Sequence, residues 1–168
     1  ALLLSLLHVL CDDCCGTGVD LDEGAVRACR TNTQRILSPD QATKVHTVLG
    51  NFGELDSDVM RPQLSASGYD VIVCNPPYRS SAQQAAYDRA CGQFGGHSED
   101  IKTLVAGETG LEAYEAVASC LARDIVAVQQ RRENEGQSAA MEALLRKQGT
   151  LIFQVEAGAR GMVGGQAE

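Results

Sequence analysis

The segment of this chain that could carry out chemistry is Asn75-Pro76-Pro77-Tyr78, which directly follows the apolar run Asp70–Cys74. Two consecutive prolines restrict φ and have no N–H to donate, so a strand must end here and nearby carbonyls stay open to a ligand. The Asn75 amide both donates and accepts, and the Tyr78 ring offers a flat face. Together these groups could accept the protons of a planar NH2 group, stack on it and direct its nitrogen at an electrophile. Methylation of an amide or an exocyclic amine requires this arrangement.

The place of this tetrapeptide favours a functional interpretation over a turn that merely ends a strand. It follows a Val/Ile run, and in open α/β sheets ligands bind beyond the carboxyl ends of the strands. The tetrapeptide resembles the motif of class I S-adenosylmethionine-dependent methyltransferases that act on adenine, cytosine or glutamine nitrogen. The resemblance implies S-adenosylmethionine as cofactor, with Asn75 and the Pro76 carbonyl accepting the two protons of the acceptor. Pro77 and Tyr78 complete the predicted catalytic group, with the Tyr78 ring packed on the acceptor plane.

The remaining segments alternate between helical and strand patterns, which predicts an α/β fold. The predicted helices are 2–10, 23–36, 111–128 and 139–147, and the predicted strands are 19–22, 45–48, 69–74 and 150–155. The polar stretch 129–137 is expected to be a solvated helix end or an exposed insertion. We therefore expect one methyltransferase domain over residues 1–168, with a Rossmann-like, doubly wound and mostly parallel sheet, truncated at both ends.

A cofactor site is expected at the ends of the second and third strands of this fold. An acid at the end of the second strand binds the ribose in such folds, and Asp20, followed by Leu21, has that place. Asp22 is expected to cap the next helix. Where related enzymes carry an Asp for the adenine amine, this chain has Asn51, and Phe52 beside it could cover the adenine. Asn75 is expected to contact the cofactor as well.

The segment Cys15-Gly16-Thr17-Gly18 is similar to the glycine loop of many methyltransferases. Asp20 follows it too closely to leave room for a helix and a second strand. We therefore expect 11–18 to be an ordinary loop, and the first strand and glycine loop to precede Ala1. In that case this chain is a fragment that is expected to bind S-adenosylmethionine weakly or not at all.

Three further segments resemble the HemK/PrmC family of protein-glutamine methyltransferases, which modify the Gln of Gly-Gly-Gln in peptide-chain release factors. They are Val19–Asn32, Glu99–Tyr114 and Leu151–Gly158. Asp100 stands where the family has Pro, so the second match is partial. The resemblance implies a release factor as protein substrate.

The formal net charge of −8 and the sequence pI of about 4.8 disfavour a protein that grips phosphate backbones. An adenine or cytosine methyltransferase acting on DNA or RNA is therefore the second interpretation, because it could use the same tetrapeptide on a flipped base. A homologue that binds without catalysing the reaction is the third.

The seven cysteines are an odd number scattered along the chain, which indicates a reducing, intracellular compartment, cytoplasmic or mitochondrial. The pair Cys11 and Cys14 has no second ligand pair at zinc-finger spacing, so no metal is expected. The apolar opening 1–10 is too short to span a bilayer and predicts a buried helix.

Overall fold

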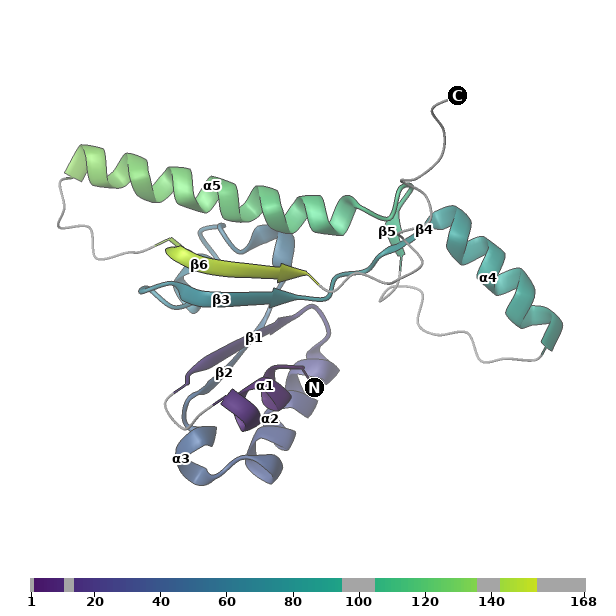
Figure 1. Ribbon diagram of the computed structural model, residues 1–168, viewed down its shortest axis with the longest axis horizontal. Coiled ribbons are helices and arrows are strands. Elements are labelled where there is room, and N and C mark those ends of the chain that lie inside the picture. The colour runs from purple at the N-terminus through teal and green to yellow at the C-terminus, as the bar shows by residue number, and fades with distance from the viewer. Residues whose placement is uncertain (1, 11–13, 95–104, 136–142, 154–168) are drawn as a thin grey trace. The chain divides into compact units, whose positions relative to one another are not determined.

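The computed structural model describes residues 2–10, 14–94, 105–135 and 143–153. Contacts between Cα atoms divide the chain into two compact units, Ala1–Ala66 and Ser67–Glu168 (Figure 1). Both units contain helices and short parallel strand pairs, so the fold is mixed α/β.

The first unit is built around the parallel strands β1 and β2, which pair from Gly16↔Val45 to Asp20↔Leu49. Parallel neighbours need a crossover connection, which here contains α2. Asp22 caps α2 by accepting from the N–H groups of Gly24 and Ala25. The elements of this unit are α1 (Leu2–Leu10), β1 (Gly16–Asp20), α2 (Glu23–Ile36), α3 (Pro39–Ala42), β2 (Val45–Leu49) and the 3-10 turns η1 (Phe52–Glu54) and η2 (Arg61–Gln63).

Two glycines of β1 allow α1 to pack closely on the strand. A Cβ at Gly16 would lie 2.6 Å from Leu3 Cδ1 and 2.8 Å from Leu7 Cδ1, and one at Gly18 would lie 3.1 Å from Leu3 Cδ2. Residues two apart in a strand face the same side, so both glycines face α1. Their role in this structure is helix–strand packing.

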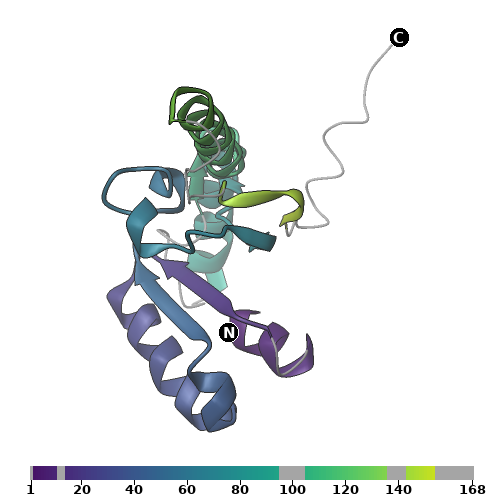
Figure 2. The ribbon, with the colours of Figure 1, turned by 90° about the vertical axis from the view of Figure 1, so that its left-hand side faces the viewer.

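The second unit contains two further parallel pairs, β3 with β6 and β4 with β5. Figures 1 and 2 show α5 along one side of the β3–β6 pair. The elements of this unit are β3 (Tyr69–Cys74), β4 (Arg79–Ser80), α4 (Ser81–Phe94), β5 (Val105–Gly107), α5 (Glu112–Glu135) and β6 (Leu145–Phe153).

The core of the second unit lies under one stripe of α5. Its buried side chains recur at helical spacing, which directs them to one face; they are Ala113, Val117, Cys120, Leu121, Asp124 and Val128. At one end of the stripe, the Tyr114 and Phe153 rings meet edge to face with centroids 5.2 Å apart. Further along, the Asp124 carboxylate accepts the N–H of Leu144, whose carbonyl accepts the N–H of Tyr69 at 2.7 Å.

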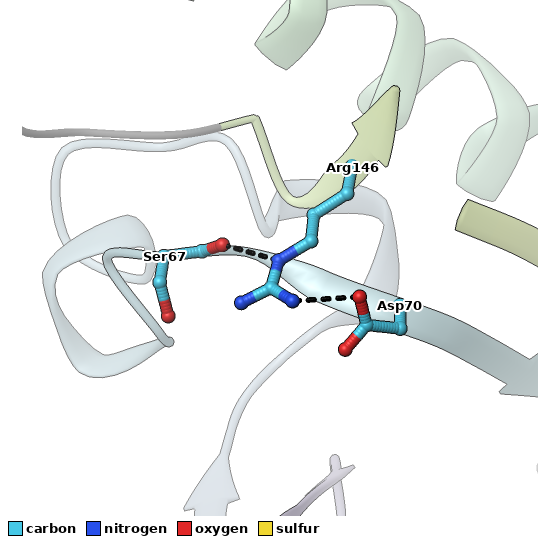
Figure 3. A network of polar contacts seen from close by, with 3 residues as sticks. All are labelled: Ser67, Asp70 and Arg146. Carbon is cyan, nitrogen blue, oxygen red and sulfur yellow. Dashed lines mark hydrogen bonds and ion pairs between the residues drawn. The ribbon is translucent and has the colours of Figure 1, made fainter. Parts of the chain in front are cut away.

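The pairing of β6 with β3 begins with a bulge, which places the side chain of Arg146 next to β3. Tyr69 pairs with Leu145 but Val71 pairs with Thr150, so the intervening residues of β6 bulge. The guanidinium of Arg146 donates to the Ser67 carbonyl at 2.8 Å and to Asp70 Oδ1 at 2.6 Å (Figure 3). Both side chains of this ion pair are substantially exposed, so its net contribution to stability is small.

The α/β class is confirmed, as are the helix over 2–10, the helix over 23–36 and the strand over 69–74. The predicted helix over 139–147 is wrong at 145–147, because β6 already starts there; residues 139–142 lie outside the described ranges. The expected loop over 11–18 is wrong at 16–18, because these residues pair in β1 under α1. The predicted strand over 19–22 is wrong at Leu21 and Asp22, because β1 ends at Asp20. Helix α5 extends through Glu135, so the described part of the polar stretch is a solvated helix end.

Replacing Gly16 with valine should destabilise the first unit, because the added atoms would overlap Leu3 and Leu7. Overpacking of this kind costs about 1–3 kcal/mol. Urea unfolding should therefore show a lower midpoint for Gly16→Val, and Leu3→Ala in the same chain should restore part of the loss. Thr17→Val, on the opposite face of β1, serves as the control. Equal midpoints for the two valine variants would contradict packing of α1 on β1.

Candidate functional site

The Asn-Pro-Pro-Tyr segment emerges at the carboxyl end of β3. Asn75 is exposed, Pro76 is buried, and Pro77 and Tyr78 are half-buried. In the described part of the chain, the Asn75 amide and the Pro76 carbonyl make no hydrogen bond. An amide that is both accessible and uncommitted can donate to, and accept from, a ligand.

The chain that leaves this segment is fixed by α4. Ser80 and Gln83 form a reciprocal cap, in which the Ser80 N–H donates to Gln83 Oε1 at 2.8 Å and the Gln83 N–H donates to Ser80 Oγ at 3.2 Å. Arg79 lies with its guanidinium carbon 4.5 Å from the Tyr87 ring centroid and donates to Gln84 Oε1 at 3.3 Å. Two successive residues after Tyr78 are thus tied to one helix.

On its other side the same chain contacts the turn that precedes α5. Gly110 has φ +83°, and a Cβ there would lie 2.6 Å from the Tyr78 carbonyl oxygen and 3.1 Å from the Ser80 nitrogen. Ser81 Oγ donates to the Gly107 carbonyl at 3.0 Å, next to the short β4–β5 pairing. Only glycine combines this φ with so close an approach.

The carboxylate of Glu112 closes this turn. It accepts the Thr109 N–H at 2.8 Å and the Gly110 N–H at 2.9 Å. Hydrogen bonds from the backbone N–H of Thr109, above all, and from that of Glu112 itself lower the pKa of Glu112 to about 2. The charged form therefore maintains the turn that contacts Tyr78.

The predicted ribose-binding acid lies at the end of β1. Asp20 is exposed, and its Oδ1 accepts the Asp22 N–H at 2.9 Å. Its other carboxylate oxygen retains acceptor capacity, which suits a sugar hydroxyl. Leu21 is 64% exposed beside it. As expected, Asp22 is the residue that caps α2.

Asn51 lies directly beyond β2 and close to Asp20 along the sheet edge, since the neighbouring Gly50 N–H donates to the Asp20 carbonyl at 2.9 Å. The Asn51 amide is already engaged locally. Its Oδ1 accepts the Gly53 N–H at 2.9 Å, and its Nδ2 donates to Glu54 Oε1 at 3.2 Å. A second lone pair on Oδ1 is what remains for an adenine amine. Phe52 is half-buried in η1.

The predicted site residues thus fall into two groups. The first unit brings together Asp20, Leu21, Asn51 and Phe52 at the carboxyl ends of its strand pair, and the second unit holds the Asn75–Tyr78 segment. An open hollow at the amino end of β3 is lined by none of them; its lining residues are Ser67, Asp70, Arg146, Lys147 and Gln148.

Sequence reasoning missed the residues that support the tetrapeptide, namely Arg79, Gly110 and Glu112. A sequence signal existed for one part of this support, because Ser80-x-x-Gln83 is a capping-box pattern. Cys74, the last residue of β3, is half-buried, and burial raises the pKa of its thiol. A neutral thiol next to Asn75 is a poor nucleophile.

Comparison of the chain with protein-family models, curated proteins and solved structures found no match. Among the described helices, none has both the length and the apolar character needed to cross a bilayer. Within the described ranges, no three His, Cys, Asp or Glu side chains gather as a metal site requires, and Cys11 lies outside those ranges.

Glu112→Gln should weaken the fold at neutral pH and flatten its dependence on acid. The folded-state pKa of about 2 lies below the ordinary value of 4.5, so the carboxylate stabilises the fold fully above the ordinary value and progressively less down to about pH 2. Urea midpoints between pH 2 and 7 should show the two proteins diverging as the pH rises. Glu115→Gln, in the same helix turn, is the control. Parallel curves for wild type and Glu112→Gln would disprove this role of Glu112.

Proposed function

We propose that this protein transfers a methyl group from S-adenosylmethionine to the side-chain amide nitrogen of glutamine in the Gly-Gly-Gln segment of a peptide-chain release factor. One observation carries the proposal: an exposed Asn75 amide, without a hydrogen bond in the described chain, stands at the carboxyl end of a strand before two prolines and a tyrosine. The resemblance of the flanking segments to protein-glutamine methyltransferases supports glutamine as the acceptor.

The strand pairing supports a doubly wound sheet as the finer description of the fold. In the order 3-2-1-4-5, strands 2 and 3 are neighbours, and so are strands 4 and 5. Under the proposal β1 and β2 correspond to strands 2 and 3, and β3 and β6 to strands 4 and 5. Each of these pairs is parallel, as the order requires. The remaining described strands, β4 and β5, are only two and three residues long and pair with each other.

The residues at the strand ends fit the cofactor that the proposal requires. Asp20 has a carboxylate oxygen available for a ribose hydroxyl, and exposed Leu21 adds apolar surface beside it. Asn51 fits less fully, because its amide serves η1. Bound S-adenosylmethionine would supply an electrophilic methyl group; the protein supplies position and electrostatics.

The acceptor amide is a weak nucleophile, because its lone pair is delocalised. Asn75 Oδ1 and the Pro76 carbonyl would accept hydrogen bonds from its two N–H groups, which raises the electron density on nitrogen. As the new N–C bond forms, the bond between methyl and sulfur would break, S-adenosylhomocysteine would leave and one amide proton would be lost to water. The half-buried ring of Tyr78 would pack on the amide plane and hold the nitrogen in line. Preorganised acceptors of this kind stabilise the transition state more than the ground state.

The acceptor can be identified by incubating the protein with a release factor and methyl-labelled S-adenosylmethionine, the latter at concentrations high enough to occupy a weak binding site. We expect label on the Gln of Gly-Gly-Gln and none after Gln→Ala or Gln→Asn, because an Asn amide is one methylene short of the donor and Ala leaves the acceptors unpaired. An oligonucleotide in a parallel reaction should stay unlabelled. Label on the oligonucleotide alone would favour a nucleic-acid methyltransferase, and label on neither would contradict the transfer function.

Asn75→Ala should lower kcat by about 10²–10³-fold, the loss typical of one preorganised polar contact, and leave the affinity for S-adenosylmethionine nearly unchanged. The reason is that the Asn75 amide would act on the acceptor protons. Asn134→Ala removes an exposed amide near the end of α5 and is the matched control. An equal loss of turnover and cofactor affinity would instead show that Asn75 acts mainly through its contact with the cofactor.

A further inference from the structure

We propose that Gly110 and Arg79 are positioning residues that fix Tyr78 in the orientation in which it packs on the acceptor, a role that rests on the methyltransferase function proposed above. Neither residue belongs to the tetrapeptide, and neither would touch the acceptor in this proposal. They act on the backbone immediately after it, from two different elements.

Tyr78 has restricted backbone on its amino-terminal side, because the Pro77 ring fixes φ one residue earlier. Its carbonyl lies against Gly110, so close that a Cβ at that position would be 2.6 Å from the oxygen. The peptide that leaves Tyr78 therefore cannot rotate toward the turn before α5. Gly110 in turn is held by the Glu112 carboxylate, which accepts its N–H.

Arg79 prevents movement in the other direction. Its guanidinium stacks on the Tyr87 ring with the central carbon 4.5 Å from the centroid, and it donates to Gln84. Gln84 is 4% exposed and donates to Asp88 Oδ1 at 2.8 Å, so the side chain that receives Arg79 is itself fixed. A planar guanidinium makes the stack and the hydrogen bond together, which a lysine cannot reproduce.

The consequence concerns the aromatic ring that faces the acceptor. With the preceding φ set by proline and the following peptide held between α4 and the turn before α5, the backbone of Tyr78 has little freedom left. The orientation of the Tyr78 ring then depends only on its side-chain torsion angles. Release of either contact should let the ring sample several orientations and reduce productive alignment of the acceptor.

The ring can be followed independently of catalysis by 19F NMR of the full chain labelled with fluorotyrosine. The chain has four tyrosines, and the Tyr78 resonance is identified by its loss in Tyr78→Phe. We expect Gly110→Ala to shift or broaden the Tyr78 resonance while that of Tyr69 stays in place. Methyl transfer to the release factor should fall at least tenfold in kcat, with KM for S-adenosylmethionine unchanged.

Gly68→Ala is the matched control, because Gly68 also has a positive φ, +70°, and a Cβ there would lie 2.1 Å from the Ala143 carbonyl oxygen. It should cost comparable stability at the other end of β3 while leaving the Tyr78 resonance unchanged. An equal response of the Tyr78 resonance to both alanine variants would overturn the proposal, since a general loss of packing would then explain it.

Arg79→Lys tests the contact of Arg79 with Tyr87 and Gln84. It also tests whether Tyr78 is positioned from outside the tetrapeptide if Gly110→Ala does not fold. It should broaden the Tyr78 resonance, whereas Tyr87→Phe, which retains the ring under the guanidinium, should leave it unchanged. A Tyr78 resonance unaffected by Arg79→Lys would overturn the role of Arg79. Absence of methyl transfer by the wild type would refute the proposed function, while the resonances would still decide whether these residues position Tyr78.

Discussion

The second unit depends on the two backbone hydrogen bonds of a single buried residue, Leu144. Its N–H donates to Asp124 of α5 and its carbonyl accepts from Tyr69 at the start of β3. Leu144 is 1% exposed, so water cannot replace either partner, and an unmade hydrogen bond there would cost about 1–3 kcal/mol. The same residue leads directly into β6. It therefore connects the helix and both strands of the β3–β6 pair, and it determines where β3 begins and hence where Asn75 emerges.

The elements that sequence reasoning could find were those specified by local chemistry. The end of β3 was predictable because its Val/Ile run is stopped by two prolines, and α2 was predictable because Asp22 caps an amphipathic segment. The start of β6 was not, since the bulge after Leu145 is part of its pairing with β3, whose residues are distant in the chain. The glycines of β1 were equally ambiguous, because helix packing and a ligand loop both require small residues.

The candidate site also has features that could be predicted from local sequence and features that could not. The tetrapeptide could be identified from sequence because its chemistry lies in four consecutive residues. The engagement of Asn51 could also have been anticipated, since Asn51-x-x-Glu54 is a local capping pattern. The contacts of Gly110 with the Tyr78 carbonyl and of Ser81 with Gly107 could not, because each joins residues far apart in the chain. Only the folded chain shows that the turn before α5 supports the segment after β3.

Burial of the side chains of α5 changes along the helix, because α5 extends beyond the core on which it packs. It has 24 residues, about 36 Å at 1.5 Å per residue, but its last described buried side chain is Val128 and residues 129–134 are exposed. Backbone amides in the packed turns can exchange with solvent deuterium only when the core opens, whereas those of the polar turns can exchange by local fraying. The amides of one continuous helix therefore exchange by two different processes. The change from one process to the other falls where the buried stripe of α5 ends.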